Sequence, residues 1–197
     1  MGKRPLVRRR GRGGMQFRAP KTGKITSAKY PVFDLSESRE GQIIDIVHER
    51  GRNAPLSKIR FDNGKISYVP AVIGSTVGSK VKFGLDSEIM DGNVISIQNI
   101  PDGTTVCNVE KQFGDGGSFI KSAGSSATVF SHGDEGVKLK LPSGKFTILN
   151  PKNRAMIGSL AGGGTNDRPL MRAGVAWRKF RSRGQKYPIV RGVAQAS

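Results

Sequence analysis

Residues 57–71 read SKIRFDNGKISYVPA, and this stretch decides the fold class. In its first five residues Ser, Ile and Phe alternate with Lys and Arg, the period-two pattern of a strand with one buried face. Asp62-Asn63-Gly64 follows, and Asn and Gly tolerate the positive φ of a tight hairpin turn. Residues 64–71 then form a second strand-like run. The stretch therefore predicts a β-hairpin.

Runs of the same kind lie on both sides of this hairpin. GQIIDIVH at 41–48 precedes it, the segment 80–83 alternates basic with apolar residues, and 93–97 gives one more run. About five strands over residues 40–98 suit a small antiparallel barrel such as the OB-fold. The sequence therefore predicts a first barrel built around the hairpin.

The strand pattern restarts after the Pro101-Asp102-Gly103 turn, where we place a domain boundary. Alternation in VKLKL (137–141) leaves one face of that strand to pack and the other to water. A second small barrel is expected over about 103–160, from strand-like runs at 104–110, 118–124, 126–130, 137–141 and 145–149, the last two joined by Pro142-Ser143-Gly144.

The charge is concentrated at the two ends of the chain. The formal charge is +18; residues 1–30 hold ten basic and no acidic side chains, and residues 152–197 hold ten basic and one acidic. The middle is nearly neutral. Apolar residues in 1–30 are too sparse to offset chain ordering at ~1–2 kcal/mol per residue, so this segment is expected to order only on a polyanion. The predicted organisation is a basic arm at 1–32, barrels at 33–102 and 103–164, and a basic extension at 165–197.

Several functional classes fail a test of spacing or composition. No apolar run approaches the ~20 residues of a membrane-spanning helix, and no Gly-Lys pair completes a phosphate-binding loop. A mitochondrial transit peptide, the alternative for the acid-free first thirty residues, is opposed by their glycines and prolines. His48, His132 and Cys107 are too few for a metal cage or a nucleophilic site. We expect no enzyme activity, metal site, cofactor, small-molecule substrate or membrane partner.

Residues 162–184, GGGTNDRPLMRAGVAWRKFRSRG, combine glycines with cations and aromatic rings. We expect Asp167 to cap a short helix with Pro169 near its start. Leu170, Gly174 and Trp177 would then share one helix face. Docking of that face on the second barrel, with Trp177 as the anchor, is the alternative to a ligand contact for this tryptophan.

The cations of the C-terminal extension favour RNA as the partner. Arginine forks match phosphate oxygens, arginine planes and aromatic rings stack on unpaired bases, and glycines let backbone N–H groups approach phosphates. No helix-turn-helix, zinc finger or basic zipper favours DNA. Six cations lie within fourteen residues, interleaved with Phe180 and Tyr187: Arg178, Lys179, Arg181, Arg183, Lys186 and Arg191.

Five stretches carry a resemblance to a known family: GDGGSFIKSAGSSATVFSH (114–132), LPSGK (141–145), NRAMIGSLAGGG (153–164), RPLMRAGVAWRKFR (168–181) and PIVRGVA (188–194). They closely resemble the universal large-subunit ribosomal protein L-two family, and VCNVEKQFGDGG looks like its archaeal and eukaryotic branch. The resemblance implies an OB-fold followed by an SH3-like barrel, with basic extensions and little helix. It implies a structural constituent of the large subunit, in the cytoplasm, that binds its RNA, supports subunit association and lies near the peptidyl transferase centre.

The resemblance also implies partners and contact residues. The partners would be large-subunit ribosomal RNA, neighbouring ribosomal proteins and small-subunit RNA at the subunit interface, with Mg²⁺ present only as an ion of the bound RNA. The residues that match RNA contacts of the family are Lys152, Arg154, Gly162, Gly163, Gly164, Arg168, Arg172, Arg178, Lys179, Arg181 and Arg191. Charge and ring content add Arg8, Arg9, Arg10, Arg12, Arg18, Lys21, Lys24, Trp177, Arg183 and Lys186.

Two rival functions stay open at this stage. A soluble translation factor built from the same two barrel types would exchange on and off ribosomes. An RNA-modifying enzyme would need a catalytic group of residues that the sequence does not offer. Family members continue into a His- and Gly-rich loop beyond the position of Ser197, so a truncated chain is expected.

Overall fold

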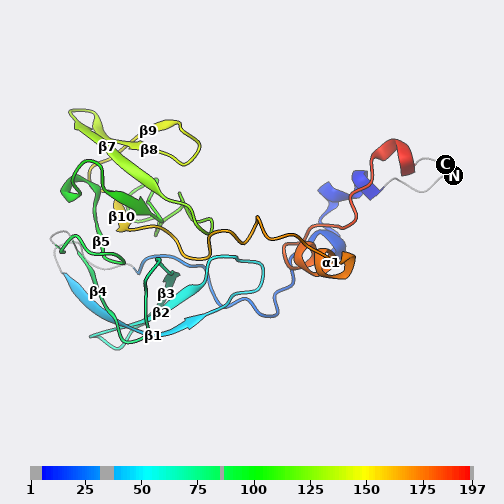
Figure 1. Cartoon of the computed structure of the whole chain (residues 1–197), viewed down its shortest axis with the longest axis horizontal. Coiled ribbons are helices and arrows are strands. Elements are labelled where there is room, and N and C mark those ends of the chain that lie inside the picture. The colour runs from blue at the N-terminus through cyan, green and yellow to red at the C-terminus, as the bar shows by residue number, and fades with distance from the viewer. Residues whose placement is uncertain (1–5, 32–37, 85–86, 196–197) are drawn as a thin grey trace. The chain divides into compact units, whose positions relative to one another are not determined.

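The computed structural model describes residues 6–31, 38–84 and 87–195, apart from the side chains of residues 6–8, 192 and 195. The chain divides into two compact units. Unit 1 takes in the described parts of 1–25, 49–51 and 167–197, and unit 2 takes in those of 26–48 and 52–166. Figure 1 shows the strands of unit 2 and the helix α1 (Ala173–Ser182) of unit 1.

Unit 2 is built on one sheet with the strand order β3-β2-β1-β4-β5-β10-β6-β7-β8-β9. With one α-helix in the described chain, the prediction of an all-β fold with little helix is confirmed. The strands are β1 (Arg39–Val47), β2 (Leu56–Phe61), β3 (Ile66–Pro70), β4 (Lys80–Phe83), β5 (Val94–Ser96), β6 (Thr105–Cys107), β7 (Ala127–Gly133), β8 (Gly136–Lys140), β9 (Phe146–Leu149) and β10 (Arg154–Ile157).

The predicted hairpin at 57–71 is formed by β2 and β3. The turn is closed by hydrogen bonds from the Phe61 N–H to the Lys65 carbonyl at 3.0 Å and from the Lys65 N–H to Asn63 Oδ1 at 3.0 Å. Gly64 has φ +76°, which Asn or Gly adopts with least strain. β1 pairs antiparallel with β2 and with β4, and this completes most of the first barrel.

Two hydrophobic cores lie on the two faces of strands that both barrels share. On β5, Val94 packs into the first core and Ile95 into the second; on β10, Met156 packs into the first and Ala155 into the second. Because successive side chains of a strand point to opposite faces, one strand serves both cores. Both predicted barrels therefore exist, but within a single compact unit.

The observed strands differ from the predicted organisation in two places. The Pro101–Gly103 turn forms, with Gly103 at φ +84°, yet β10 returns to pair with β5 across the predicted boundary. The expected strand at 118–124 is not formed: Phe119 makes one isolated bridge to Val109, and Ile120 then turns away with φ +54°. β10 was not predicted.

The end of the predicted N-terminal arm belongs to unit 2. Ala28 and Tyr30 are buried, the Tyr30 N–H donates to the Gly116 carbonyl at 2.9 Å, and the Tyr30 ring meets the Phe83 ring edge-to-face at 6.1 Å. The segment 26–31 thus packs into the barrels instead of forming part of a separate arm.

Unit 1 brings the two basic extensions together. Its elements are α1 and three short 3₁₀ helices, Leu6–Arg12, Met15–Phe17 and Gly192–Gln195. A Cβ on Gly184 would lie 2.6 Å from the Ala19 nitrogen, so the two backbones touch at this point. Arg181 donates to the Met15 carbonyl at 3.5 Å. The sequence prediction had treated the extensions separately.

Candidate nucleic-acid interface

Nearly all of the net charge lies in unit 1. Its ranges contain eighteen Lys and Arg residues against Glu49 and Asp167, a formal charge of +16, which leaves +2 for unit 2. A charge of this density attracts polyanions and opposes its own compaction. Unit 1 is therefore the candidate nucleic-acid interface.

Most of the predicted contact cations of unit 1 point into solvent. The side chains of Lys179, Arg181 and Lys186 are half-buried, and that of Arg8 lies outside the described residues. Arg50 was not predicted as a contact residue, because it lies in the neutral middle of the sequence. It belongs to unit 1, where its N–H donates to the Gly23 carbonyl at 3.0 Å. The exposed predicted cations are Arg9, Arg10, Arg12, Arg18, Lys21, Lys24, Arg168, Arg172, Arg178, Arg183 and Arg191.

The helix α1 differs from its prediction at the N-terminus. It begins at Ala173 with Arg172 in the N-cap position and no side-chain cap, so Asp167, Pro169 and Leu170 lie outside it. The physical reason is that residues 163–167 are already used in turns. Cations in the last turn, Lys179 and Arg181, lie at the negative end of the helix dipole.

The aromatic rings of the extension have different environments. Phe180 and Tyr187 stack on each other, with centroids 5.3 Å apart and planes inclined by 11°, so each ring covers one face of the other. Trp177 is 52% exposed, while its neighbour Ala176 is buried. Trp177 is thus not a buried anchor, and its ring is accessible to a ligand.

A groove of about 590 Å³ lies in the N-terminal part of unit 1. Arg9 and Arg12 line it together with Met15 and Phe17. Met15 is 82% exposed, which is unusual for a large apolar side chain on a charged surface. The groove combines cations with apolar surface, the combination that accepts both phosphates and bases.

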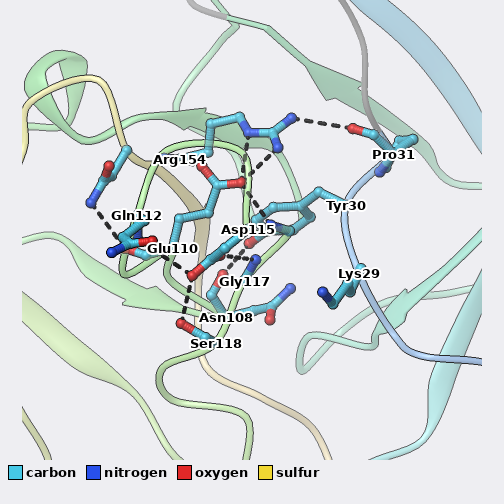
Figure 2. Close-up of polar contacts among 12 residues, drawn as sticks. Lys29, Tyr30, Pro31, Asn108, Glu110, Gln112, Asp115, Gly117, Ser118 and Arg154 are labelled. Atoms are coloured by element: carbon cyan, nitrogen blue, oxygen red, sulfur yellow. Dashed lines mark hydrogen bonds and ion pairs between the residues drawn. The ribbon is translucent and has the colours of Figure 1, made fainter.

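Arg154 was predicted to contact RNA, and the structure corrects this prediction. Its side chain is 10% exposed and its guanidinium donates to Glu110 Oε1 from Nε at 3.1 Å and from Nη2 at 2.6 Å (Figure 2). Nη1 donates to the Pro31 carbonyl at 3.3 Å, and the guanidinium lies 5.4 Å from the Tyr30 ring centroid. These contacts inside unit 2 occupy the guanidinium, so Arg154 is not among the cations that the structure exposes.

The loop that carries Glu110 holds the segment 28–31 in place. Tyr30 donates its hydroxyl proton to the Asn108 carbonyl, and Lys121 donates to the Ala28 and Gly117 carbonyls at 2.5 and 2.8 Å. Burial, reinforced by the nearby cations Arg52 and Lys29, lowers the pKa of Lys121 to about 8. These contacts fix the backbone of residues 28–31 within unit 2.

The predicted glycines of unit 2 divide into two kinds. A Cβ on Gly162 would lie 2.9 Å from the Asn53 carbonyl oxygen, and Gly163 packs against Gly124, so both are required by contacts within the protein. Gly164 has φ +73° with open space around it. Lys152 and all three glycines are exposed, and a side chain could be added without a clash at Gly164 alone of the three.

The described residues offer neither a membrane-spanning helix nor a metal site. None of the described helices is long and apolar enough to cross a membrane. Within the same described ranges, no group of three or more His, Cys, Asp or Glu side chains is arranged to hold a metal ion. Burial raises the pKa of the single thiol, Cys107, to about 12, so this thiol is held in its neutral form.

Known proteins resemble this chain over almost its whole length. The family model described as Ribosomal Proteins L2, C-terminal domain, matches residues 90–197. Proteins named "Large ribosomal subunit protein uL2" are 74% identical in Cenarchaeum symbiosum and 71% identical in Nitrosopumilus maritimus, each over 100% of this chain and 81% of the relative. The protein of that name from Sulfolobus acidocaldarius is 42% identical over 98% of this chain and 81% of the relative. With a family model over more than half of its residues and relatives this similar over nearly all of them, the chain belongs to the ribosomal protein L2 family, in its archaeal-type form.

Proposed function

We propose that unit 1, which contains most of the two basic extensions, binds large-subunit ribosomal RNA. Unit 2 is the folded body of the protein. As a member of this family, the chain is a structural constituent of the large ribosomal subunit. The observation that carries the proposal is the division of charge, +16 in unit 1 against +2 in unit 2.

The mechanism is neutralisation of phosphates by cations held on a small scaffold. Among the described side chains, the apolar residue buried in unit 1 is Ala176, so this unit gains little from apolar burial. Its cations repel one another until an anion neutralises them. RNA therefore supplies a large part of the free energy that orders unit 1, and unit 1 in turn fixes RNA segments around itself.

The partners and chemistry follow from this assignment. We propose contacts with neighbouring ribosomal proteins and with small-subunit RNA at the subunit interface, and a supporting position near the peptidyl transferase centre. The protein carries out no catalysis and needs no cofactor, and Mg²⁺ enters only with the RNA. The rival translation factor would be lost from large subunits washed at high salt, whereas a structural constituent is retained.

The direct test is Arg178→Ala combined with Arg181→Ala, measured by filter binding to large-subunit RNA. If about ten phosphates are engaged, raising salt from ~50 to ~200 mM weakens wild-type binding roughly 10³–10⁵-fold. Removing two phosphate contacts makes the plot of log affinity against log salt concentration less steep, by between one and two units of slope. The barrels keep their thermal stability, because both residues lie in unit 1.

Arg60→Ala combined with Lys65→Ala is the matched control, since it removes two exposed cations from the β2–β3 hairpin of unit 2. This pair leaves RNA affinity close to that of the wild type. Equal losses for the two double variants would show that only net charge matters, and would overturn the assignment of the interface to unit 1.

A further inference from the structure

Three large apolar side chains of unit 2 lie on the solvent face of the strands β7, β8 and β9. Phe130, Phe146 and Ile148 are 54%, 46% and 51% exposed. The two phenylalanine rings meet edge-to-face with centroids 5.0 Å apart. We name these three residues and Lys138 the aromatic–lysine patch. In Figure 1 the three strands form the outer end of the sheet, on the side where the strand order terminates.

The strand register explains why these side chains share a face. Lys138 pairs with Ile148 and Lys140 pairs with Phe146, while Val137 and Leu139 point into the second core. On β7, Val129 points into the second core and the next residue, Phe130, lies on the outer face. A rigid sheet therefore holds the rings in position, which a flexible loop would not do.

The patch carries cations beside its rings. Lys138 Nζ lies 4.8 Å from the Phe146 ring centroid and 5.7 Å from that of Phe130. Lys140 and Lys145 flank the β8–β9 turn, whereas the acidic residues of this meander, Asp134 and Glu135, both fall in the β7–β8 turn. Flat rings with ammonium groups alongside match a nucleotide, whose base stacks and whose phosphate is anionic.

The size of the patch favours a nucleotide over a protein partner. Three large side chains that are half exposed offer roughly 300 Å² of apolar surface. A stable protein interface needs about 800 Å² from each partner. One or two unpaired bases need no more than the patch provides.

We propose that the aromatic–lysine patch is a stacking site for an unpaired nucleotide of ribosomal RNA. The base stacks on the exposed side of the Phe130–Phe146 pair, and the adjoining phosphate is bound by Lys138 or Lys140. The site rests on the proposed RNA-binding function but lies in unit 2, so it adds a base-stacking contact outside the cationic interface of unit 1. It gives the nearly neutral unit a preference for single-stranded segments over helices.

The test compares two labelled probes that carry the same backbone charge, octauridylate and an abasic ribose-phosphate octamer. Phe130→Leu combined with Phe146→Leu keeps the apolar area and removes the rings. This double variant binds octauridylate about tenfold more weakly, the scale of one lost stacking contact, and binds the abasic octamer like the wild type. Phe130→Tyr combined with Phe146→Tyr restores the octauridylate affinity.

Phe113→Leu is the matched control, because Phe113 is 46% exposed and lies outside the patch. The site is refuted if the double variant loses affinity equally for both probes, or loses no more than Phe113→Leu does. It is also overturned if octauridylate binding is unchanged while reconstituted large subunits lose a protein contact at this face. Arg178→Ala with Arg181→Ala weakens both probes alike, so failure of the unit 1 interface and failure of the patch give different results.

Discussion

Replacing Arg154 distinguishes a structural ion pair from an RNA contact. Arg154→Met keeps the length of the side chain and removes its charge. The variant loses both guanidinium bonds to Glu110, the bond to the Pro31 carbonyl and the cation–π contact with Tyr30. The Glu110 carboxylate, which is fully buried, then keeps only the backbone N–H groups of Arg154 and Gly116, at 3.0 and 3.1 Å.

Leaving a buried charge without its partner costs about 3–5 kcal/mol. This is a large share of the roughly 5–15 kcal/mol by which a domain is stable. The thermal unfolding midpoint of unit 2 is expected to fall by about 10–15 °C. Glu110→Gln combined with Arg154→Met is less destabilised than Arg154→Met alone, because no unpaired charge is then left in the interior.

The assay is thermal unfolding followed by circular dichroism, with RNA affinity measured at low temperature, where the variant is folded. Lys152→Met is the control, since Lys152 is exposed two residues away and its described contact is made by the backbone. We expect Lys152→Met to unfold at the wild-type temperature. An Arg154→Met protein with wild-type stability and a larger loss of RNA affinity than Lys152→Met would refute the structural role.

Two further predictions concern Lys121 in unit 2 and the close backbone contact in unit 1. Burial lowers the pKa of Lys121 to about 8, whereas the ordinary pKa of a lysine is 10.5. Between these two pH values the folded protein therefore binds fewer protons than the unfolded protein. Stability to urea therefore rises by about 1 kcal/mol from pH 8 to pH 10.5, after a discount for partial exposure; Lys121→Met removes this rise, and a flat wild-type profile contradicts it. Gly184→Ala places a Cβ 2.6 Å from the Ala19 nitrogen at φ +71° and is expected to raise the rate of tryptic cleavage in unit 1 about fivefold. Gly174→Ala, with open space around it, leaves that rate unchanged, and equal rates for both variants would contradict the close backbone contact.

Two of the strands that were predicted from the sequence, β2 and β8, have one wet face. β2 and β8 alternate apolar and basic residues, and the turns at Asn63-Gly64 and Ser143-Gly144 mark where they reverse. β10 has the burial pattern of a strand enclosed on both faces, so it shows no alternation. Its position between two cores depends on pairing with residues about fifty to sixty positions away, which no local pattern encodes.

The candidate site shows the same limit of local information. The clustering of cations at the chain ends, visible in the sequence, identifies the residues that unit 1 exposes. Arg154 has the same residue type and stands next to the extension, but Glu110, forty-four positions away, determines its role. The aromatic–lysine patch was not predicted because Phe130, Lys138 and Phe146 lie on three different strands, and only the pairing of those strands brings them together.

The division of buried surface between the units decides how an anion acts on each. Among the described side chains, 28 of the 29 buried apolar residues lie in unit 2, and Ala176 is the one in unit 1. Ordering costs ~1–2 kcal/mol per residue, which unit 2 offsets by apolar burial and unit 1 does not. A polyanion therefore changes the order of unit 1, where it removes repulsion among cations, and adds little to the stability of unit 2. Protection of unit 1 against trypsin on addition of RNA, with an unchanged unfolding temperature for the barrels, is the consequence of that division.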